Sequence, residues 1–110
     1  MVSAYPRRGE IWLIDFDPTV GSEIRKTRPG LIVSPDAMNE HLRTVLVMPL
    51  TSGSRAAPFR LELVFRDRDG RLLGDQIRTL DRKRLRKRLD VLDPDIVADA
   101  LAILRDMFTV

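Results

Sequence analysis

The sequence of 110 residues contains no cysteine, and His41 is its only histidine. These absences exclude a disulfide scaffold, a thiol nucleophile, a thiolate or histidine-rich metal centre and a nuclease with paired imidazoles. The uninterrupted apolar runs reach only four or five residues, which excludes a membrane-spanning helix. Residues 1–8 lack the apolar core of a signal peptide, so we expect the protein in the cytoplasm.

Charge, in contrast, is plentiful and unevenly placed along the chain. There are 19 Lys and Arg against 16 Asp and Glu, a net charge of +3, and sixteen of the cations are arginines. Residues 1–88 carry a balance of +7, whereas residues 89–110 carry −4. The planar guanidinium of arginine matches a phosphate. The distribution therefore indicates either a solvated surface with an uneven dipole or a body that binds a polyanion.

Strand patterns dominate the first 80 residues. Apolar and alternating runs predict strands over residues 10–16, 31–33, 44–50, 60–65 and 71–80, with a turn at 67–70. Alternation places Trp12, Ile14 and Phe16 on one face of the first strand. Residues 35–43 are expected to form either a short helix or a long loop. These spacings suit a small antiparallel barrel or sandwich, and no linker divides the single domain expected over residues 1–110.

Helical signals come late in the chain. Asp81 is expected to cap a short helix through Leu89, because Leu85 and Leu89 are four residues apart. Asp93 and Pro94 have the residue types of an N-cap and a first helical position, and they predict a C-terminal helix. Its apolar stripe is expected at helical spacing, over Val97, Ala100, Leu101, Leu104, Met107 and Phe108.

Five short segments, in one order and without a large gap, resemble a known family. They are Arg8-Gly-Glu-Ile-Trp12, Asp15-Phe-Asp-Pro18, Gly21-Ser-Glu-Ile-Arg-Lys-Thr-Arg-Pro29, Pro49-Leu-Thr51 and Asp75-Gln-Ile-Arg78. Together they resemble the MazF/PemK toxins, sequence-specific endoribonucleases of type II toxin–antitoxin systems. The resemblance runs from about Arg8 to Leu89. Ile24 departs from it, because the family usually has a polar residue or glycine there, and this departure concerns base preference more than chemistry.

The resemblance implies a fold, an activity and partners. The fold would be mainly β with short helices, a small SH3-like (CcdB/PemK-like) antiparallel β-barrel packed by a C-terminal α-helix. The activity would be cleavage of single-stranded RNA, without metal or cofactor, to 2′,3′-cyclic phosphate and 5′-hydroxyl ends. The protein would form a homodimer with the RNA groove along its interface, and an antitoxin of the MazE type would lay an acidic tail in that groove.

Arg28 is the first candidate catalytic residue. The proline that follows restricts it to extended conformations, so it is expected where loop 17–27 enters a strand. A guanidinium held there suits a phosphate and keeps its charge near neutral pH. From the residues alone, a surface arginine paired with Glu23 is the plainer interpretation. The resemblance implies instead that Arg28 stabilises the charge of the phosphorane and gives a proton to the leaving 5′-oxygen.

Two further catalytic residues and six RNA-binding residues follow from the same motifs. Thr51 is either a routine hydroxyl at a strand end or, by resemblance, the group that hydrogen-bonds the scissile phosphate. Glu23 either forms a structural salt bridge, orients Arg28 or accepts the proton of the 2′-hydroxyl. Gln76 either reads a base edge, oriented by Asp75, or forms structural hydrogen bonds. The RNA-binding residues expected are Ser22, Arg25, Lys26, Ser52, Gln76 and Arg78.

Other features carry weaker signals or belong to alternatives. His41 lies outside every matching motif and is interpreted as an ordinary residue. The six cations in residues 82–88 form either a solvated face or a second phosphate-binding surface. Asp15 and Asp17 alone are thin support for magnesium. The alternatives in function are a non-enzymatic, CcdB-like gyrase poison, which would need a tryptophan near the C-terminus where this chain has only Trp12, and a plain RNA-binding barrel.

Overall fold

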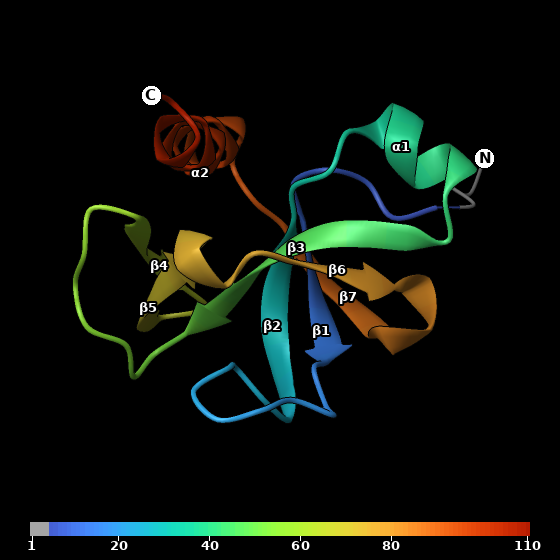
Figure 1. Ribbon diagram of the computed structural model, residues 1–110, viewed down its shortest axis with the longest axis horizontal. Coiled ribbons are helices and arrows are strands. Elements are labelled where there is room, and N and C mark those ends of the chain that lie inside the picture. The colour runs from blue at the N-terminus through green and yellow to red at the C-terminus, as the bar shows by residue number, and fades with distance from the viewer. Residues whose placement is uncertain (1–4) are drawn as a thin grey trace.

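The computed structural model describes residues 5–110, so residues 1–4 of the segment inspected for a signal peptide lie outside it. Its elements alternate short strands with a few helical turns (Figure 1). In chain order they are β1 (Glu10–Asp15), β2 (Thr27–Ile32), α1 (Asp36–His41), β3 (Thr44–Thr51), β4 (Arg60–Phe65), β5 (Arg68–Leu73), the 3-10 turn η1 (Gly74–Gln76), β6 (Arg78–Asp81), the 3-10 turn η2 (Arg82–Arg84), β7 (Leu85–Val91) and α2 (Pro94–Met107).

The strands form one antiparallel sheet in the order β4-β5-β3-β2-β1-β7, with β6 paired to β3. The third strand is shared: it pairs with β2 and β6 along most of its length and with β5 at its last two residues, Leu50 and Thr51. The expected mainly β architecture with a C-terminal helix is confirmed. In residues 5–110 the barrel is not closed, because β4 and β7 are the two ends of the sheet.

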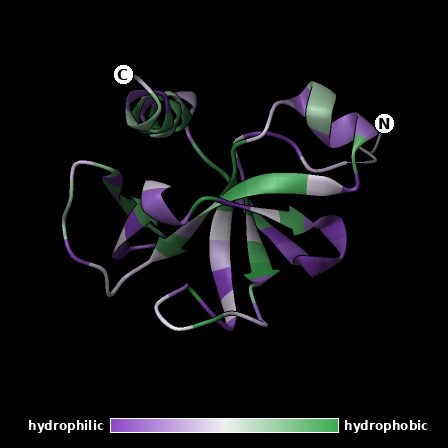
Figure 2. Ribbon diagram, in the orientation of Figure 1, coloured by the Kyte–Doolittle hydropathy of each residue, from purple (hydrophilic) through white to green (hydrophobic). Residues whose placement is uncertain are grey.

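The central strands of the sheet carry an apolar cluster on each face. One cluster joins β1, β2 and β3 to β5 and α2, through residues such as Ile11, Leu72 and Leu104. The other contains Ile14 and Phe16 with partners from β2, β3 and β6, and Trp12 packs against it, which confirms the predicted face of β1. Figure 2 shows the apolar residues concentrated in the central strands and the polar ones in the loops and in β7.

The C-terminal helix follows its sequence signals. The Asp93 carboxylate accepts a hydrogen bond from the amide of Asp95, and Pro94 is the first helical residue. Ala100 and Leu104 are buried against the first cluster, whereas Phe108 follows the end of α2 and is 74% exposed. Figure 1 shows α2 on the side of β4 and η1, two elements that it contacts. No helix in residues 5–110 is long and apolar enough to cross a bilayer.

The helix predicted from Asp81 to Leu89 is wrong. Asp81 caps only the three-residue turn η2, by accepting a hydrogen bond from the amide of Lys83, and the chain then continues as β7. Residues four apart lie on one face of a strand as well as on one face of a helix, so Leu85 and Leu89 fit both structures. Pairing with β1 decides in favour of the strand.

Three smaller predictions also need correction or refinement. The strand expected over residues 71–80 is divided by η1, and the halves are β5 and β6. The turn between β4 and β5 is at Arg66 and Asp67, which have positive φ angles of 50° and 65°, rather than at residues 67–70. Of the two possibilities for residues 35–43, the helix is the one formed, as α1.

Candidate active site

Arg28 and Thr51 lie near the adjoining ends of the neighbouring strands β2 and β3. The pairing of β2 with β3 places Gly30 opposite Pro49 and Leu31 opposite Met48. Extending this register outward by two residues brings Arg28 opposite Thr51. The two residues line one pocket of about 190 Å³, here called the Arg28 pocket, whose walls are Arg28, Pro29, Leu50, Thr51, Ser52, Phe65, Arg68, Asp69 and Gly70.

The Arg28 side chain is exposed, and no hydrogen bond or ion pair holds its guanidinium within residues 5–110. The plainer interpretation, a salt bridge with Glu23, is therefore not what the structure shows. The Glu23 carboxylate instead accepts a hydrogen bond of 2.7 Å from the amide of Val20, within its own loop. The pocket thus combines an unengaged cation with a hydroxyl, which complements a phosphate.

Most other predicted site residues lie in a second pocket of about 310 Å³, here called the Gln76 pocket, lined by Ser22, Glu23, Asp75, Gln76, Ile77 and Arg78. The Gln76 side chain accepts a hydrogen bond from the amide of Ile24 at 2.8 Å and donates one to the carbonyl of Ser22 at 3.3 Å. Gln76 therefore fixes the path of loop 17–27. Arg25 and Lys26, in the same loop, are exposed and line neither pocket.

The side chain that Asp75 orients is that of Arg60, not that of Gln76. Its two carboxylate oxygens accept hydrogen bonds from Arg60, at 3.0 and 2.8 Å, and Arg60 also donates to the carbonyl of Arg55 in loop 52–58. The hydrogen bond from Arg60 lowers the pKa of Asp75, and the same bond raises the pKa of Arg60. The predicted role of Asp75 beside Gln76 is thus replaced by an anchor for the second loop.

Comparisons with known proteins identify the family of this chain. A family model described as the PemK-like, MazF-like toxin of type II toxin–antitoxin systems matches residues 7–108. The chain belongs to this toxin family. It is 43% identical over 108 residues to the endoribonuclease PemK of Escherichia coli, an alignment that covers 93% of this chain and 81% of the relative.

Solved structures of the toxin family have the same fold. The crystal structure of MazF from Deinococcus radiodurans superposes with a TM-score of 0.83 and 28% identity, covering 96% of this chain and 97% of that one. A mycobacterial endoribonuclease in complex with its cognate antitoxin superposes with a TM-score of 0.77 and 26% identity, covering 92% of each chain. This member of the toxin family therefore shares its architecture along almost its whole length.

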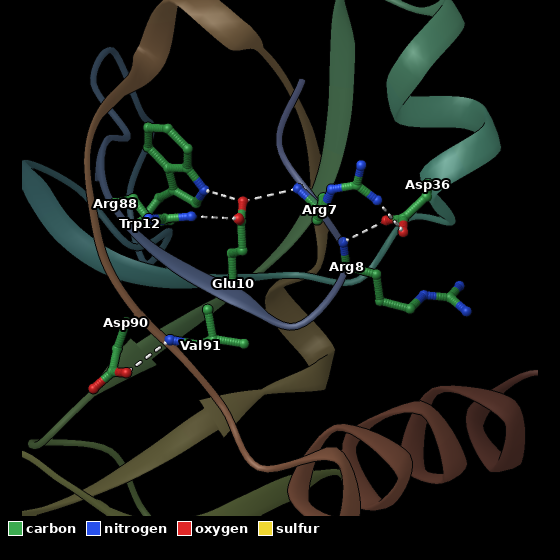
Figure 3. A network of polar contacts seen from close by, with 8 residues as sticks. All are labelled: Arg7, Arg8, Glu10, Trp12, Asp36, Arg88, Asp90 and Val91. Carbon is green, nitrogen blue, oxygen red and sulfur yellow. Dashed lines mark hydrogen bonds and ion pairs between the residues drawn. The ribbon is translucent and has the colours of Figure 1, made fainter. Parts of the chain in front are cut away.

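Some of the basic residues 82–88 of this family member form hydrogen bonds and ion pairs with other parts of the chain. Arg84 donates to the carbonyls of Asp15 and Asp17, and Arg86 forms an ion pair of 2.9 Å with Asp15, which lowers the pKa of that carboxyl. Figure 3 shows the buried Glu10 carboxylate receiving Arg88 together with Trp12 and the amide of Arg7. Much of this charge therefore compensates carboxylates and carbonyls.

Two other candidates from the sequence lie away from the Arg28 pocket. His41 is exposed and ends α1, just before β3 begins, so it is at the opposite end of β3 from Thr51. Asp15 is engaged by Arg86, as described above. Within residues 5–110, no group of three or more His, Asp or Glu side chains is placed to hold a metal ion.

The β4–β5 hairpin supplies pocket walls that the sequence did not indicate. Phe65, Arg68, Asp69 and Gly70 line the Arg28 pocket because β5 pairs with the end of β3, with Thr51 opposite Arg71. The sequence shows this segment only as a turn followed by a strand. Without the pairing partner of β5, nothing local in these residues points to the site.

Proposed function

We propose that the protein is the toxin of a type II toxin–antitoxin system and cleaves single-stranded RNA as an endoribonuclease. The observation that supports this most directly is the unengaged guanidinium of Arg28 in the same pocket as Thr51, at the ends of two strands. A phosphodiester offers the matching anionic oxygens. The relative named endoribonuclease PemK supports the same activity.

In the proposed reaction the 2′-oxygen of the RNA attacks the adjacent phosphorus. The bond from phosphorus to the 5′-oxygen breaks, which leaves a 2′,3′-cyclic phosphate and a 5′-hydroxyl. Arg28 and Thr51 hydrogen-bond the phosphate oxygens as negative charge builds on them. Because a guanidinium does not lose its proton near neutral pH, Arg28 donates a hydrogen bond to the leaving oxygen, and that oxygen takes its proton from solvent. No step of the proposed reaction uses a metal ion.

For the acceptor of the 2′-hydroxyl proton we propose the Glu23 carboxylate. It is exposed and lines the Gln76 pocket, and a carboxylate within hydrogen-bond reach of the 2′-hydroxyl can accept its proton. Ser22, Arg25 and Lys26 on this loop, with Ser52, Gln76 and Arg78 around it, would contact the RNA on either side of the scissile phosphate. Arg78 already donates to the carbonyl of Phe16 at 3.3 Å.

The gyrase-poison alternative is not favoured. The one tryptophan of the chain, Trp12, is on β1, packs against the second apolar cluster and donates a hydrogen bond of 3.0 Å to Glu10. It is therefore a structural residue far in sequence from the C-terminus. The remaining alternative, an RNA-binding barrel without turnover, is separated from the proposed function by the cleavage assay.

The decisive experiment maps the 5′-hydroxyl ends that the purified protein creates in RNA. We expect cuts at defined sites, unchanged in EDTA. A single 2′-deoxy substitution at the nucleotide just 5′ of a cut should abolish cleavage there, because it removes the attacking oxygen. Cutting of the deoxy-substituted strand, or loss of cutting in the chelator, would refute the mechanism. Binding without new ends would identify the non-enzymatic alternative.

The proposed partners are a second copy of the chain and a MazE-like antitoxin. A homodimer would cover some of the exposed apolar residues, among them Phe59, Met107 and Phe108. The mycobacterial neighbour bound to its cognate antitoxin supports such a partner. We propose that the antitoxin's acidic tail occupies the Arg28 pocket and places carboxylates where RNA phosphates bind.

This occlusion predicts competition between antitoxin and RNA. An uncleavable RNA, with a 2′-deoxy nucleotide at the cut, should be displaced by the antitoxin, and both affinities should fall as salt rises. The antitoxin should weaken the binding of RNA, and RNA should weaken the binding of the antitoxin by the same factor. Fluorescence anisotropy of labelled RNA, titrated with the cognate antitoxin from the native host, measures it. Simultaneous binding without loss of affinity would show that inhibition acts through another surface.

A further inference from the structure

A third pocket, distinct from the Gln76 pocket, adjoins the Arg28 pocket along the β4–β5 hairpin. It has a volume of about 410 Å³ and is lined by Ser52, Glu62, Leu63, Val64, Asp69, Gly70 and Arg71. We call it the hairpin pocket. It shares Ser52, Asp69 and Gly70 with the Arg28 pocket, so the two pockets adjoin at these residues. None of the motifs in the sequence accounts for it.

The two pockets are held at a fixed separation by the backbone of the hairpin. Thr51 pairs with Arg71 in the sheet. A β-carbon placed on Gly70 would lie 3.0 Å from a methyl carbon of Leu50 and 3.2 Å from the carbonyl oxygen of Thr51. The hairpin therefore lies directly against the end of β3, and a group bound in the hairpin pocket is the immediate neighbour of one bound at Thr51.

The Arg71 guanidinium lines this pocket, and three of its five N–H donors are engaged. Nε and Nη2 donate to the same oxygen of Glu62, at 3.1 and 2.7 Å, and Nη1 donates to the carbonyl of Ser54. The edge of the guanidinium that carries Nε and Nη2 therefore faces Glu62. Its flat face is a surface on which a nucleobase stacks well.

Asp69 gives the pocket its polar recognition group. Its side chain is exposed, and within residues 5–110 no hydrogen-bond donor or cation engages its carboxylate, whereas Glu62 and Asp75 each have an arginine. Val64 lies directly across from it in the hairpin and is 65% exposed, which adds an apolar surface. A free carboxylate repels phosphate, and it attracts the N–H groups of a base.

We propose that the hairpin pocket binds a guanine of the nucleotide next to the scissile phosphate, and that Asp69 is the residue that selects it. This inference rests on the proposed function. The two oxygens of a carboxylate match the N1–H and N2–H donors, which are adjacent on the Watson–Crick edge of guanine. Adenine and cytosine place an acceptor beside their amino group, and uracil has one N–H between two carbonyls, so each of them leaves a carboxylate oxygen facing an acceptor. Single-stranded RNA exposes this edge.

The test is the sequence of the cut sites in a randomised single-stranded RNA. For the wild-type protein we expect guanine enriched about 10-fold at one fixed position directly beside the cut. Asp69→Asn should still cut but lose this enrichment, because an amide cannot accept two hydrogen bonds side by side. Asp67→Asn is the matched control: Asp67 is in the same hairpin, lines neither pocket and has a positive φ that asparagine tolerates, so the guanine preference should persist.

A second measurement does not depend on the folding of a variant. Replacing the selected guanine by inosine removes the N2 amino group, and we expect it to lower the kcat/KM of the wild-type protein about 10-fold. Cutting without a guanine preference, an unchanged preference in Asp69→Asn, or equal cleavage of the inosine substrate would overturn the inference and leave the proposed function standing. Absence of any cutting by the wild-type protein would overturn both.

Discussion

Replacing Arg28 by alanine should separate catalysis from stability. The guanidinium is exposed and makes no hydrogen bond or ion pair with residues 5–110, so the free energy of unfolding should change by no more than about 0.5 kcal/mol. In the proposed transition state the same group hydrogen-bonds a phosphate that gains negative charge. Loss of one such donor typically costs about 10²- to 10³-fold in rate, which corresponds to about 2.7–4 kcal/mol on the barrier.

Two further variants make this prediction specific. Arg28→Lys keeps the charge but lacks the planar fork, so it should recover only a small part of the lost rate. Arg43→Ala should cut at the wild-type rate. Arg43 is also an exposed arginine, but it precedes β3, whose eight residues place it roughly 25 Å from Thr51.

The assay combines initial rates on a fluorogenic RNA with urea unfolding of each variant. Arg28→Ala cutting within threefold of the wild-type rate would remove Arg28 from the site. A large loss of stability would also refute the reasoning, because it would reveal a structural contact for this side chain.

Two other predictions concern the anchors of the loops. Gln76→Ala removes the hydrogen bonds to Ile24 and Ser22, so amide exchange of Ile24 should accelerate and KM for RNA should rise several-fold, whereas Thr79→Ala, an exposed position on β6, should change neither. The Arg60 ion pair lowers the pKa of Asp75, so its stabilisation is present above the unfolded value of about 4 and is lost as the pH falls through the folded value. Wild type should exceed Asp75→Asn by about 1 kcal/mol in free energy of unfolding at pH 7. Urea unfolding at a series of falling pH values should show this gap closing once Asp75 takes up its proton, and a constant gap would contradict the linkage.

Elements with local signals were predictable from the sequence. Asp93 and Pro94 fix the start of α2 through contacts within the first helical turn. The alternation of Leu61, Leu63 and Phe65 places the inner face of β4, because the period of a strand is a local property. The motifs singled out Arg28 and Thr51, and the structure places both in the lining of one pocket.

The features that were missed depend on long-range pairing. Residues 85–91 became a strand only because β1 offered an unpaired edge on that side. The Arg60–Asp75 ion pair joins residues 15 positions apart, and no local spacing indicates it. Asp69 reaches the Arg28 pocket only because β5 pairs with the end of β3. Contacts of this kind are set by the assembled sheet rather than by neighbouring residues.

The side chains that fasten the two loops of the site do so through hydrogen bonds to backbone atoms. The path of each loop therefore does not depend on which residues the loop contains. Gln76 bonds the amide of Ile24 and the carbonyl of Ser22, and Arg60 bonds the carbonyl of Arg55. None of these contacts depends on which side chain the loop residue carries. The side chains that would face a substrate can therefore be exchanged while the loops keep their course. The scaffold is suited to acquiring new sequence preferences by substitution in loops 17–27 and 52–58, without redesign of the turn η1 that fastens both.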